Sequence, residues 1–252
     1  MTIKFVTDYP AAFITEKKIL VISDLHLGIE HELYEKGIVI HPQSQKFQQI
    51  LGELIELTKA KTLVILGDLK HEVPGISLRE EREIPKLLSY LTERVKVILT
   101  KGNHDTDLKG LTPESMQVVD GKGIRIGNYG FFHGHAWPSK KLMQCDYLFM
   151  GHLQPSVEFV DDFGYRMVEQ VWVKGKLDSE TIKKKYKIDK VGKLNIVIAP
   201  SFNRLAGSFP VNKILKEQLL GPLLTNKALN LEKSKVYLLD GTYLGLIGKF
   251  EK

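Results

Sequence analysis

The chain has 252 residues, of which 43% are hydrophobic and 26% charged, and this composition excludes a disordered or fibrous protein. Its one cysteine, Cys145, excludes an intrachain disulfide framework and favours a reducing, intracellular setting. Lys and Arg number 36 against 30 Asp and Glu, an excess that permits anionic partners without identifying them. The N-terminus does not resemble a signal peptide, and no stretch approaches the ~20 apolar residues that cross a bilayer. We therefore expect a cytoplasmic protein with no membrane partner.

The first hundred residues alternate short apolar runs with helical patterns. Apolar runs that each end on polar residues predict buried strands at 18–23, 62–66 and 95–99. Apolar residues at a helical period predict helices at 42–61 and 79–94. Pro85 is expected to bend the second helix or to delay its start. This β-α-β-α-β order indicates a parallel sheet with helical crossovers.

Beyond residue 110 the pattern changes to short strands with glycine turns. Strands are expected at 116–119, 123–126, 129–132, 146–150, 165–173, 194–199, 236–239 and 243–250, and helices at 178–186 and 211–220. A helix-flanked sheet followed by a strand-rich half predicts an α/β protein, a four-layer α/β/β/α sandwich of two packed mixed sheets with flanking helices. We expect a single domain over residues 1–252, in which 1–160 carry the motifs and 161–252 complete the second sheet.

Most of the excess positive charge lies in one stretch, residues 164–193. Nine lysine and arginine residues and four acidic residues occur there, which gives a charge of +5 in thirty residues. Such a stretch is typical of a solvated helix face or loop, and less often it forms a surface that binds nucleic acid. The sequence leaves both interpretations open.

The predicted strands end on residues that commonly bind metal ions. Open α/β sheets bind ligands along the edge where their strands end. Any one such residue is more often a turn or cap residue than a metal ligand. Their joint occurrence at successive strand ends nevertheless predicts a metal site in one cleft. The side chains delivered to it would be Asp24, His26, Asp68, Asn103, His104, His133 and His152.

These residues form a series of short motifs, namely D-x-H at 24–26, G-D at 67–68, G-N-H-D at 102–105, a histidine at 133 and G-H at 151–152. In this order and spacing they resemble the calcineurin-like metallophosphoesterase superfamily. The segments 23–28 and 67–71 look more narrowly like a prokaryotic branch, archaeal by the same likeness. That branch is related to SbcD-type DNA-repair nucleases and DNA-ligase-associated phosphoesterases. The segment 199–203 also resembles the branch, so the likeness extends over most of the chain.

The resemblance implies a centre of two divalent metal ions. Asp24 and His26 would bind the first ion, and Asp68 would bridge the two. The second ion would be bound mainly by Asn103, His133 and His152. His135 is the alternative to His133, which is favoured because it directly follows a predicted strand.

The chain departs from the family pattern at Gln154. The family has G-H-x-H where this chain has Gly151-His152-Leu153-Gln154. The amide oxygen of Gln154 would replace an imidazole nitrogen as a neutral ligand of the first ion. Because oxygen ligands favour harder cations, Mn²⁺ is the expected metal, with Mg²⁺, iron and Zn²⁺ as alternatives.

The implied reaction is hydrolysis of a phosphate ester, most of all a phosphodiester, by attack of a metal-bound hydroxide. His104 would act as the general acid for the leaving oxygen, and Asp105 would orient His104. The alternative is a nuclease, or a nuclease-related subunit, that acts on DNA in repair. A metal-binding pseudoenzyme is a third interpretation, motivated by Gln154 alone. The expected partner is a phosphate-ester substrate, with nucleic acid among the candidates, and the sequence leaves the oligomeric state open.

Two further side chains have more than one interpretation. His71 lies three residues after Asp68 and would either contact the substrate or be structural. Cys145 is expected to be a packing residue, because nothing near it in the sequence would pair it with a base.

Overall fold

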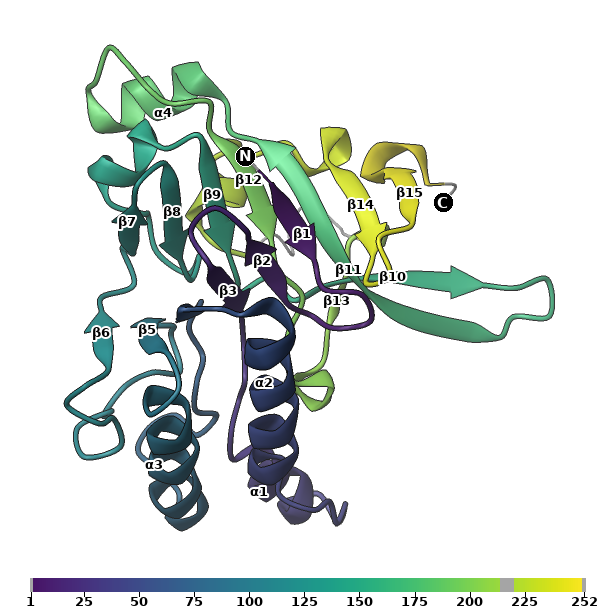
Figure 1. Ribbon diagram of the computed structural model, residues 1–252. Helices are drawn as coiled ribbons and strands as arrows, with labels where there is room; N and C mark the ends of the chain where they lie inside the picture. Colours follow the sequence, from purple (N-terminus) through teal and green to yellow (C-terminus); the bar gives the residue numbers. More distant parts are fainter. Residues whose placement is uncertain (1, 214–219, 251–252) are drawn as a thin grey trace.

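The apolar runs of the first hundred residues form the centre of a six-stranded mixed sheet in the computed structural model, which describes residues 2–213 and 220–250 (Figure 1). Its strands are β1 (Ile3–Phe5), β2 (Ala12–Ile14), β3 (Ile19–Ile22), β4 (Thr62–Ile65), β5 (Lys96–Thr100) and β6 (Gln117–Val119), paired in that order. The strands β3 to β6 are parallel, whereas β1 and β2 add an antiparallel edge. The predicted parallel arrangement is therefore confirmed for β3, β4 and β5. The predicted strand at 116–119 joins this first sheet.

Two long helices cover the outer face of the first sheet. They are α2 (Ser44–Thr58) and α3 (Leu78–Thr92), and their apolar residues pack against β3, β4 and β5 in one buried cluster. The helix α3 continues through Pro85 instead of starting after it. A capping box between Ser77 and Glu80 holds its first turn, and its buried apolar stripe compensates for the cost of an internal proline.

The second half of the chain builds a nine-stranded mixed sheet. Its strands are β7 (Ile124–Ile126), β8 (Tyr129–Phe132), β9 (Tyr147–Met150), β10 (Pro155–Val160), β11 (Arg166–Lys176), β12 (Asn195–Ile198), β13 (Phe209–Pro210), β14 (Lys235–Leu238) and β15 (Tyr243–Leu246). The strands β8, β9 and β12 are parallel to one another, and β11 is antiparallel to β12. The order is β13-β10-β11-β12-β9-β8-β7, with β14 on β11 and β15 on β14.

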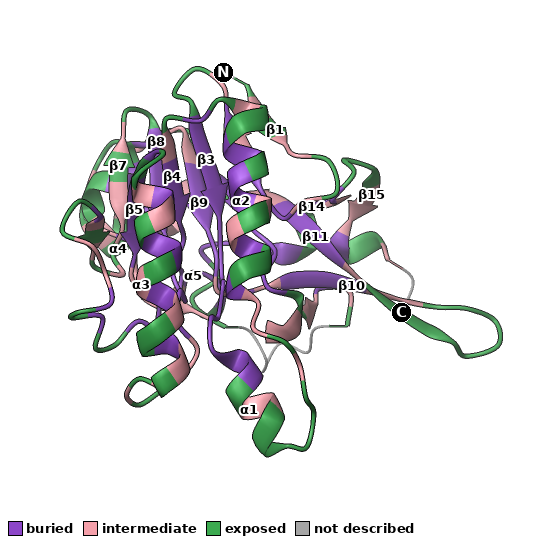
Figure 2. Cartoon of the chain, turned by 60° about the horizontal axis from the view of Figure 1, so that its bottom comes forward, coloured by how far each residue is buried: buried purple, intermediate pink, exposed green. Residues whose placement is uncertain are grey.

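Three apolar clusters define the four layers. The first lies between the two long helices and the first sheet, and the second lies between the two sheets. The third covers the outer face of the second sheet, where α4 (Ser179–Tyr186) and α5 (Pro222–Thr225) contribute Ile182, Leu223 and Leu224. Figure 2 shows that the central strands are buried, whereas the helices α2 and α3 have one buried face and one exposed face. The predicted α/β/β/α sandwich of two mixed sheets is confirmed.

Several elements differ from the sequence-based prediction. The short helix α1 (Ile29–Glu35) and the strands β2 and β10 were not predicted. The strand expected at 243–250 ends at Leu246 in a 3₁₀ turn. The helix expected at 211–220 lies mostly outside the described residues, since 214–219 are not described.

The strands β10 and β11 extend as a two-stranded arm beyond the sandwich (Figures 1 and 2). Its tip carries Phe163 and Tyr165, which are 97% and 72% exposed.

The part of the basic stretch from Lys176 onward lies at the end of the second sheet opposite the strand ends that carry the predicted metal ligands. In the register, Lys176 of β11 pairs with Asn195 at the start of β12, and Asn195 pairs with Tyr147 at the start of β9. The candidate ligand His152 instead follows the last residue of β9. None of the described helices combines the length and apolarity needed to cross a bilayer.

Candidate metal centre

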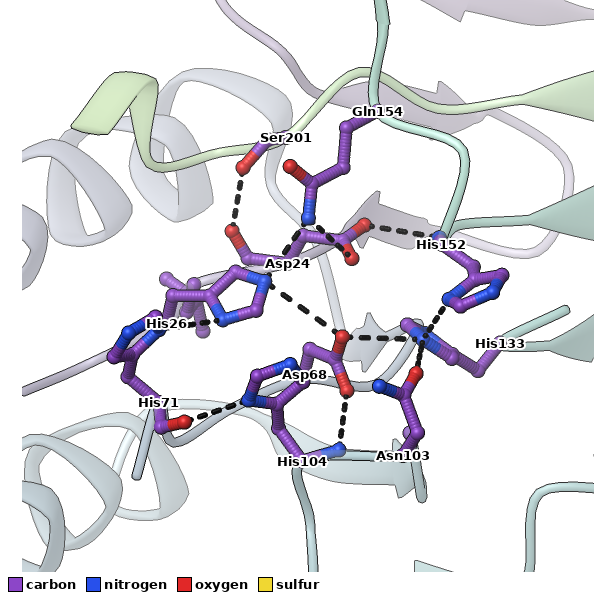
Figure 3. A network of polar contacts seen from close by, with 12 residues as sticks. Asp24, His26, Asp68, His71, Asn103, His104, His133, His152, Gln154 and Ser201 are labelled. Carbon is purple, nitrogen blue, oxygen red and sulfur yellow. Dashed lines mark hydrogen bonds and ion pairs between the residues drawn. The ribbon is translucent and has the colours of Figure 1, made fainter. Parts of the chain in front are cut away.

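Five loops meet where strands of both sheets end. The loops after β3, β4 and β5 come from the first sheet, and those after β8 and β9 come from the second. Figure 3 shows the side chains that these loops bring together around Asp68. The structure gathers every predicted site residue of the motifs in this one place, namely Asp24, His26, Asp68, Asn103, His104, His133, His152 and Gln154.

The donor atoms form three groups: one contains His26, His71 and His104, and the other two share Asp68. Of these two, one contains Asp24, His26 and Asp68, and the other contains Asp68, His133 and His152. Within each group the donor atoms lie within 4.8 Å of one another. The Oδ2 atom of Asp68 lies 3.6 Å from Nε2 of His26 and 3.2 Å from Nε2 of His133, so one carboxylate faces both groups.

Backbone strain is concentrated at these donors. Asp24, His26, Asp68, His152 and Gln154 all have a positive φ, between 41° and 67°, although none of them is glycine. A residue with a Cβ adopts this left-handed conformation at a cost of order 1 kcal/mol or more. Hydrogen bonds between the loops hold two of these backbones, from the amide of Asp24 to the carbonyl of Gly67 (3.1 Å) and from the amide of His26 to the carbonyl of Asp68 (2.9 Å).

Two glycines let the loops approach this closely. A Cβ on Gly102 would lie 2.0 Å from Oδ1 of Asp68, and a Cβ on Gly151 would lie 2.0 Å from Oγ of Ser23. Both contacts are far shorter than van der Waals distance, so any side chain at either position would displace the donors. The glycines of the G-N-H-D and G-H motifs are thus explained by close packing at the site.

A buried histidine carries positive charge between the carboxylates. Burial lowers the pKa of His133, but its hydrogen bond to Asp68 and the charges of Asp68 and Asp24 outweigh burial and raise that pKa to about 9. The Nε2 atom of His133 lies within 3.2 Å of Oδ2 of Asp68, Oδ1 of Asn103 and Nδ1 of His152. Three acceptors around a single proton provide the surroundings that a cation requires.

Two histidines at the site are neutral, and its two carboxylates have no lysine or arginine beside them among the described residues. Burial lowers the pKa of His26 to about 3 and that of His152 to about 4, so both rings are neutral and able to offer a lone pair. Burial also raises the pKa of Asp24 to about 6. No described lysine or arginine forms an ion pair with Asp24 or Asp68. A neutral imidazole and carboxylate set of this kind fits divalent cations.

His104 lies beside the candidate metal donors. Its amide donates to Oδ1 of Asp68 (2.9 Å), and its Nδ1 donates to the carbonyl of His71 (2.6 Å). Its Nε2 therefore remains the nitrogen that can exchange a proton.

The expected orientation of His104 by Asp105 is wrong. The carboxylate of Asp105 accepts hydrogen bonds from the amides of Leu69 and Gly102 (2.9 and 2.8 Å), and it makes none to the His104 ring. Asp105 is almost fully buried, and burial raises its pKa. It ties the G-D loop to the G-N-H-D loop, while the carbonyl of His71 orients His104.

The terminal amide of Gln154 reaches the donor group that contains Asp24 and His26. Its Nε2 lies 3.3 Å from Oδ1 of Asp24 and 2.9 Å from Nε2 of His26. Since a rotation of the amide exchanges its nitrogen and oxygen, Oε1 can take the same place as a ligand. His135 lies outside all three donor groups, and its ring centre is 5.3 Å from that of His133. The geometry thus favours His133 over His135.

A chain of hydrogen bonds supports His26 from behind. Nδ1 of His26 lies 3.3 Å from Nδ1 of His71, and Nε2 of His26 lies 2.9 Å from the terminal amide of Gln154. The tautomer of His26 that ligates through Nε2 would have its proton on Nδ1 and donate it to Nδ1 of His71. The proton of His71 is then on Nε2, which donates to Glu32 of α1 (2.5 Å). Sequence reasoning missed Glu32, since the unpredicted helix α1 places it here. The open question about His71 is resolved in part, because its ring supports His26.

The segment 199–203 closes over the D-x-H loop. The hydroxyl of Ser201 donates to the carbonyl of Asp24 (2.8 Å), and the side-chain amide of Asn203 donates to the carbonyl of Leu25 (2.9 Å). The amide of Phe202 donates to the carbonyl of Ser23 (2.7 Å). The sequence indicated this segment only through its resemblance, and the structure shows that it holds the loop from which Asp24 and His26 project.

Comparison with known proteins gives the class to which this fold and site belong. The family model of the calcineurin-like phosphoesterases matches residues 17–201, so the chain belongs to this family and is a metal-dependent hydrolase. This match includes all of the motif residues described above.

Two solved structures are similar to this chain, and the first of them shows the same fold. The nuclease MPE of Pseudomonas putida is similar with a TM-score of 0.55 and 17% identity, over 94% of this chain and 91% of that one. The phosphoesterase YfcE of E. coli is similar with a TM-score of 0.42 and 16% identity, over 90% of this chain and 96% of that one. A comparison with curated proteins found no match.

Proposed function

We propose that this protein hydrolyses phosphodiesters at a centre of two divalent cations. The observation that carries the proposal is the pair of donor groups that share the carboxylate of Asp68. A single anionic donor between two groups is the arrangement by which two-metal phosphoesterases hold their ions ~3.5–4 Å apart. In such a centre the bound ions supply Lewis acidity and the activation of water.

The residues divide between the two ions as follows. Asp24, His26 and Gln154 would hold the first ion, and Asn103, His133 and His152 would hold the second. Asp68 would bind both. The proton on His133 would leave when the second ion binds, because imidazole ligates through a lone pair. Gln154 and Asn103 add two amide oxygens to the set, and this supports Mn²⁺ as the preferred metal.

His104 would protonate the leaving oxygen. Its Nδ1 is occupied by the carbonyl of His71, so the transferable proton would be on Nε2. His104 stands edge-on to His26 with ring centres 4.8 Å apart, and it would therefore lie beside the ion that His26 holds.

DNA is the second candidate substrate. The fold shared with a nuclease motivates this alternative, but the sequence identity is only 17%. The basic stretch 164–193 gives it less support than the sequence suggested, because α4 and Lys176 lie at the opposite end of the second sheet. A small phosphodiester is thus the preferred substrate class. The single domain and the cytoplasmic location remain predictions.

The proposal is tested by assaying hydrolysis with Mn²⁺ on bis(p-nitrophenyl) phosphate, p-nitrophenyl phosphate and labelled single-stranded DNA. Asp68→Asn removes the shared charge at little change in size, and we expect it to lower kcat/KM for the diester by about 10³-fold. Asp162→Asn, at an exposed position, is the matched control and should keep full activity. Equal rates for wild type and Asp68→Asn on all three substrates would leave the pseudoenzyme as the remaining interpretation.

The role of His104 is tested by the nature of the leaving group. His104→Ala should slow the hydrolysis of an alkyl diester by about 10²-fold or more, since an alkoxide needs a proton to depart. Hydrolysis of the p-nitrophenyl diester should slow much less, because p-nitrophenolate leaves without one. The surface variant His31→Ala is the control. An equal loss on both diesters would contradict the general-acid role.

A further inference from the structure

A pocket lined by four lysines, called the lysine pocket below, lies between the two sheets, at the end opposite the candidate metal donors. Its volume is about 510 Å³, and its floor is the inner face of the second sheet at β9, β11, β12 and β14. Ile3 of β1 borders it on the side of the first sheet. Four lysines, two tyrosines and an asparagine contribute to the lining: Lys174, Lys176, Lys233, Lys235, Tyr147, Tyr237 and Asn195.

The strand register explains why the lysines gather there. Lys174 and Lys176 are two residues apart on β11, so their side chains emerge on the same face of the sheet. Lys174 pairs directly with Lys235 of β14. Like charges directly opposite each other in an antiparallel pair are destabilising. The fold alone gives no reason for this arrangement.

The lysines of the pocket have no acidic partners among the described residues. None of the four forms an ion pair with a described carboxylate, whereas other surface lysines, such as Lys183 and Lys193, do. No ion pair among the described residues therefore compensates the positive charge of the pocket.

The most deeply placed lysine is partly desolvated. The Nζ of Lys174 lies 4.3 Å from the ring centre of Phe5 and 4.8 Å from that of Tyr237. Burial, and then the charge of Lys235, lowers the pKa of Lys174. An anion in the pocket would replace the lost hydration of this ammonium group and relieve its repulsion with Lys235.

We propose that this pocket binds a nucleoside polyphosphate such as ADP or ATP. The four lysines would contact the phosphates, while Tyr147 and Tyr237 offer aromatic surface and Asn195 a donor and an acceptor for a base. The volume is within the range of about 300–1,000 Å³ that small-molecule sites occupy. The site is separate from the metal centre, and it does not depend on the proposed hydrolysis.

The proposal is tested by calorimetric titration of the full chain with ATP in the presence of EDTA, so that divalent ions cannot carry the nucleotide to the metal centre. We expect saturable binding by wild type and by Asp68→Asn alike. The double variant Lys174→Met/Lys235→Met should weaken the affinity at least about tenfold, since it removes two charged contacts. Lys183→Met/Lys185→Met removes the same charge from α4 and should bind as wild type does.

Inorganic triphosphate separates the phosphate contacts from the base contacts. We expect it to bind more weakly than ATP, and Tyr237→Ala to weaken ATP binding without changing triphosphate binding. Equal binding of ATP by wild type and the Lys174/Lys235 variant would overturn the proposal. So would loss of binding in Asp68→Asn, or no binding of ATP at millimolar concentration. The melting temperature of each variant, measured alongside, shows that it is folded.

Discussion

At the scale of single residues, the metal donors are placed by strained backbone and by partners outside the motifs. Asp24, His26 and Asp68 each have a positive φ that the surrounding hydrogen bonds enforce. Such strain persists only where the neighbouring structure over-determines the conformation, and it is frequent at functional sites. Glu32 and His71 extend this control to the ring of His26, because their hydrogen bonds favour the tautomer of His26 that ligates through Nε2.

The role of Glu32 is tested by Glu32→Gln. The amide oxygen could still accept from Nε2 of His71, but it carries no charge and the amide nitrogen could donate instead, so His26 would lose part of the preference for the tautomer that ligates through Nε2. We expect Mn²⁺ affinity, measured by calorimetry, to fall by about tenfold, the lower end of the range for partners behind a metal ligand. Glu35→Gln, on the same helix and paired with His31, should leave the affinity unchanged. The same affinity in both variants would contradict the relay.

The crowding of lysines in the lysine pocket predicts that replacing Lys174 with an uncharged residue stabilises the protein. Lys174→Met keeps the apolar stem and removes a charge opposite Lys235, and we expect the free energy of unfolding to rise by about 0.5 kcal/mol.

Because the pKa of Lys174 is lowered on folding, the unfolded wild-type chain binds more protons between the folded and unfolded pKa values. Wild-type stability should therefore gain with rising pH across that window, and the variant should lack this gain. Urea titrations at several pH values measure both effects, and a less stable variant would contradict the account.

At the scale of elements, the site is held by contacts between segments that are distant in the chain. The segment 199–203 follows β12 of the second sheet and bonds to the D-x-H loop, which follows β3 of the first. Asp105 similarly joins the loops after β4 and β5. The geometry of the centre thus depends on the docking of the two sheets.

Asn203→Ala tests this dependence. It removes the donor to the carbonyl of Leu25 and leaves that buried carbonyl without this partner, at a cost of about 1–3 kcal/mol. We expect a lower melting temperature together with weaker Mn²⁺ binding, because the loop that carries Asp24 and His26 is released. Asn212→Ala removes comparable hydrogen bonds, between the Asn212 side chain and the backbone of Glu158, away from the site. That control should lower stability alone, and a similar loss of metal affinity in both variants would count against a specific role for Asn203.

At the scale of the whole molecule, the sequence predicted the layers and the donors but not what supports them. Strand ends with Asp, Asn and His are local features, and those at β3, β4 and β5 were visible because parallel strands end at one edge. The bonds from Glu32 to His71 and from Asn203 to Leu25 join residues that are far apart in sequence and carry no local pattern. The role expected for Asp105 was wrong for the same reason, since its partners are backbone amides that sequence does not reveal.

The central claim is that Asp68 joins two metal ions in one centre. Its most direct test is the Mn²⁺ stoichiometry of the full chain, measured by equilibrium dialysis and by anomalous diffraction from crystals grown with the metal. The account predicts two ions per chain, both in contact with Asp68, and loss of at least one ion in Asp68→Asn. A single ion in the wild type, or two ions retained in Asp68→Asn, would contradict it.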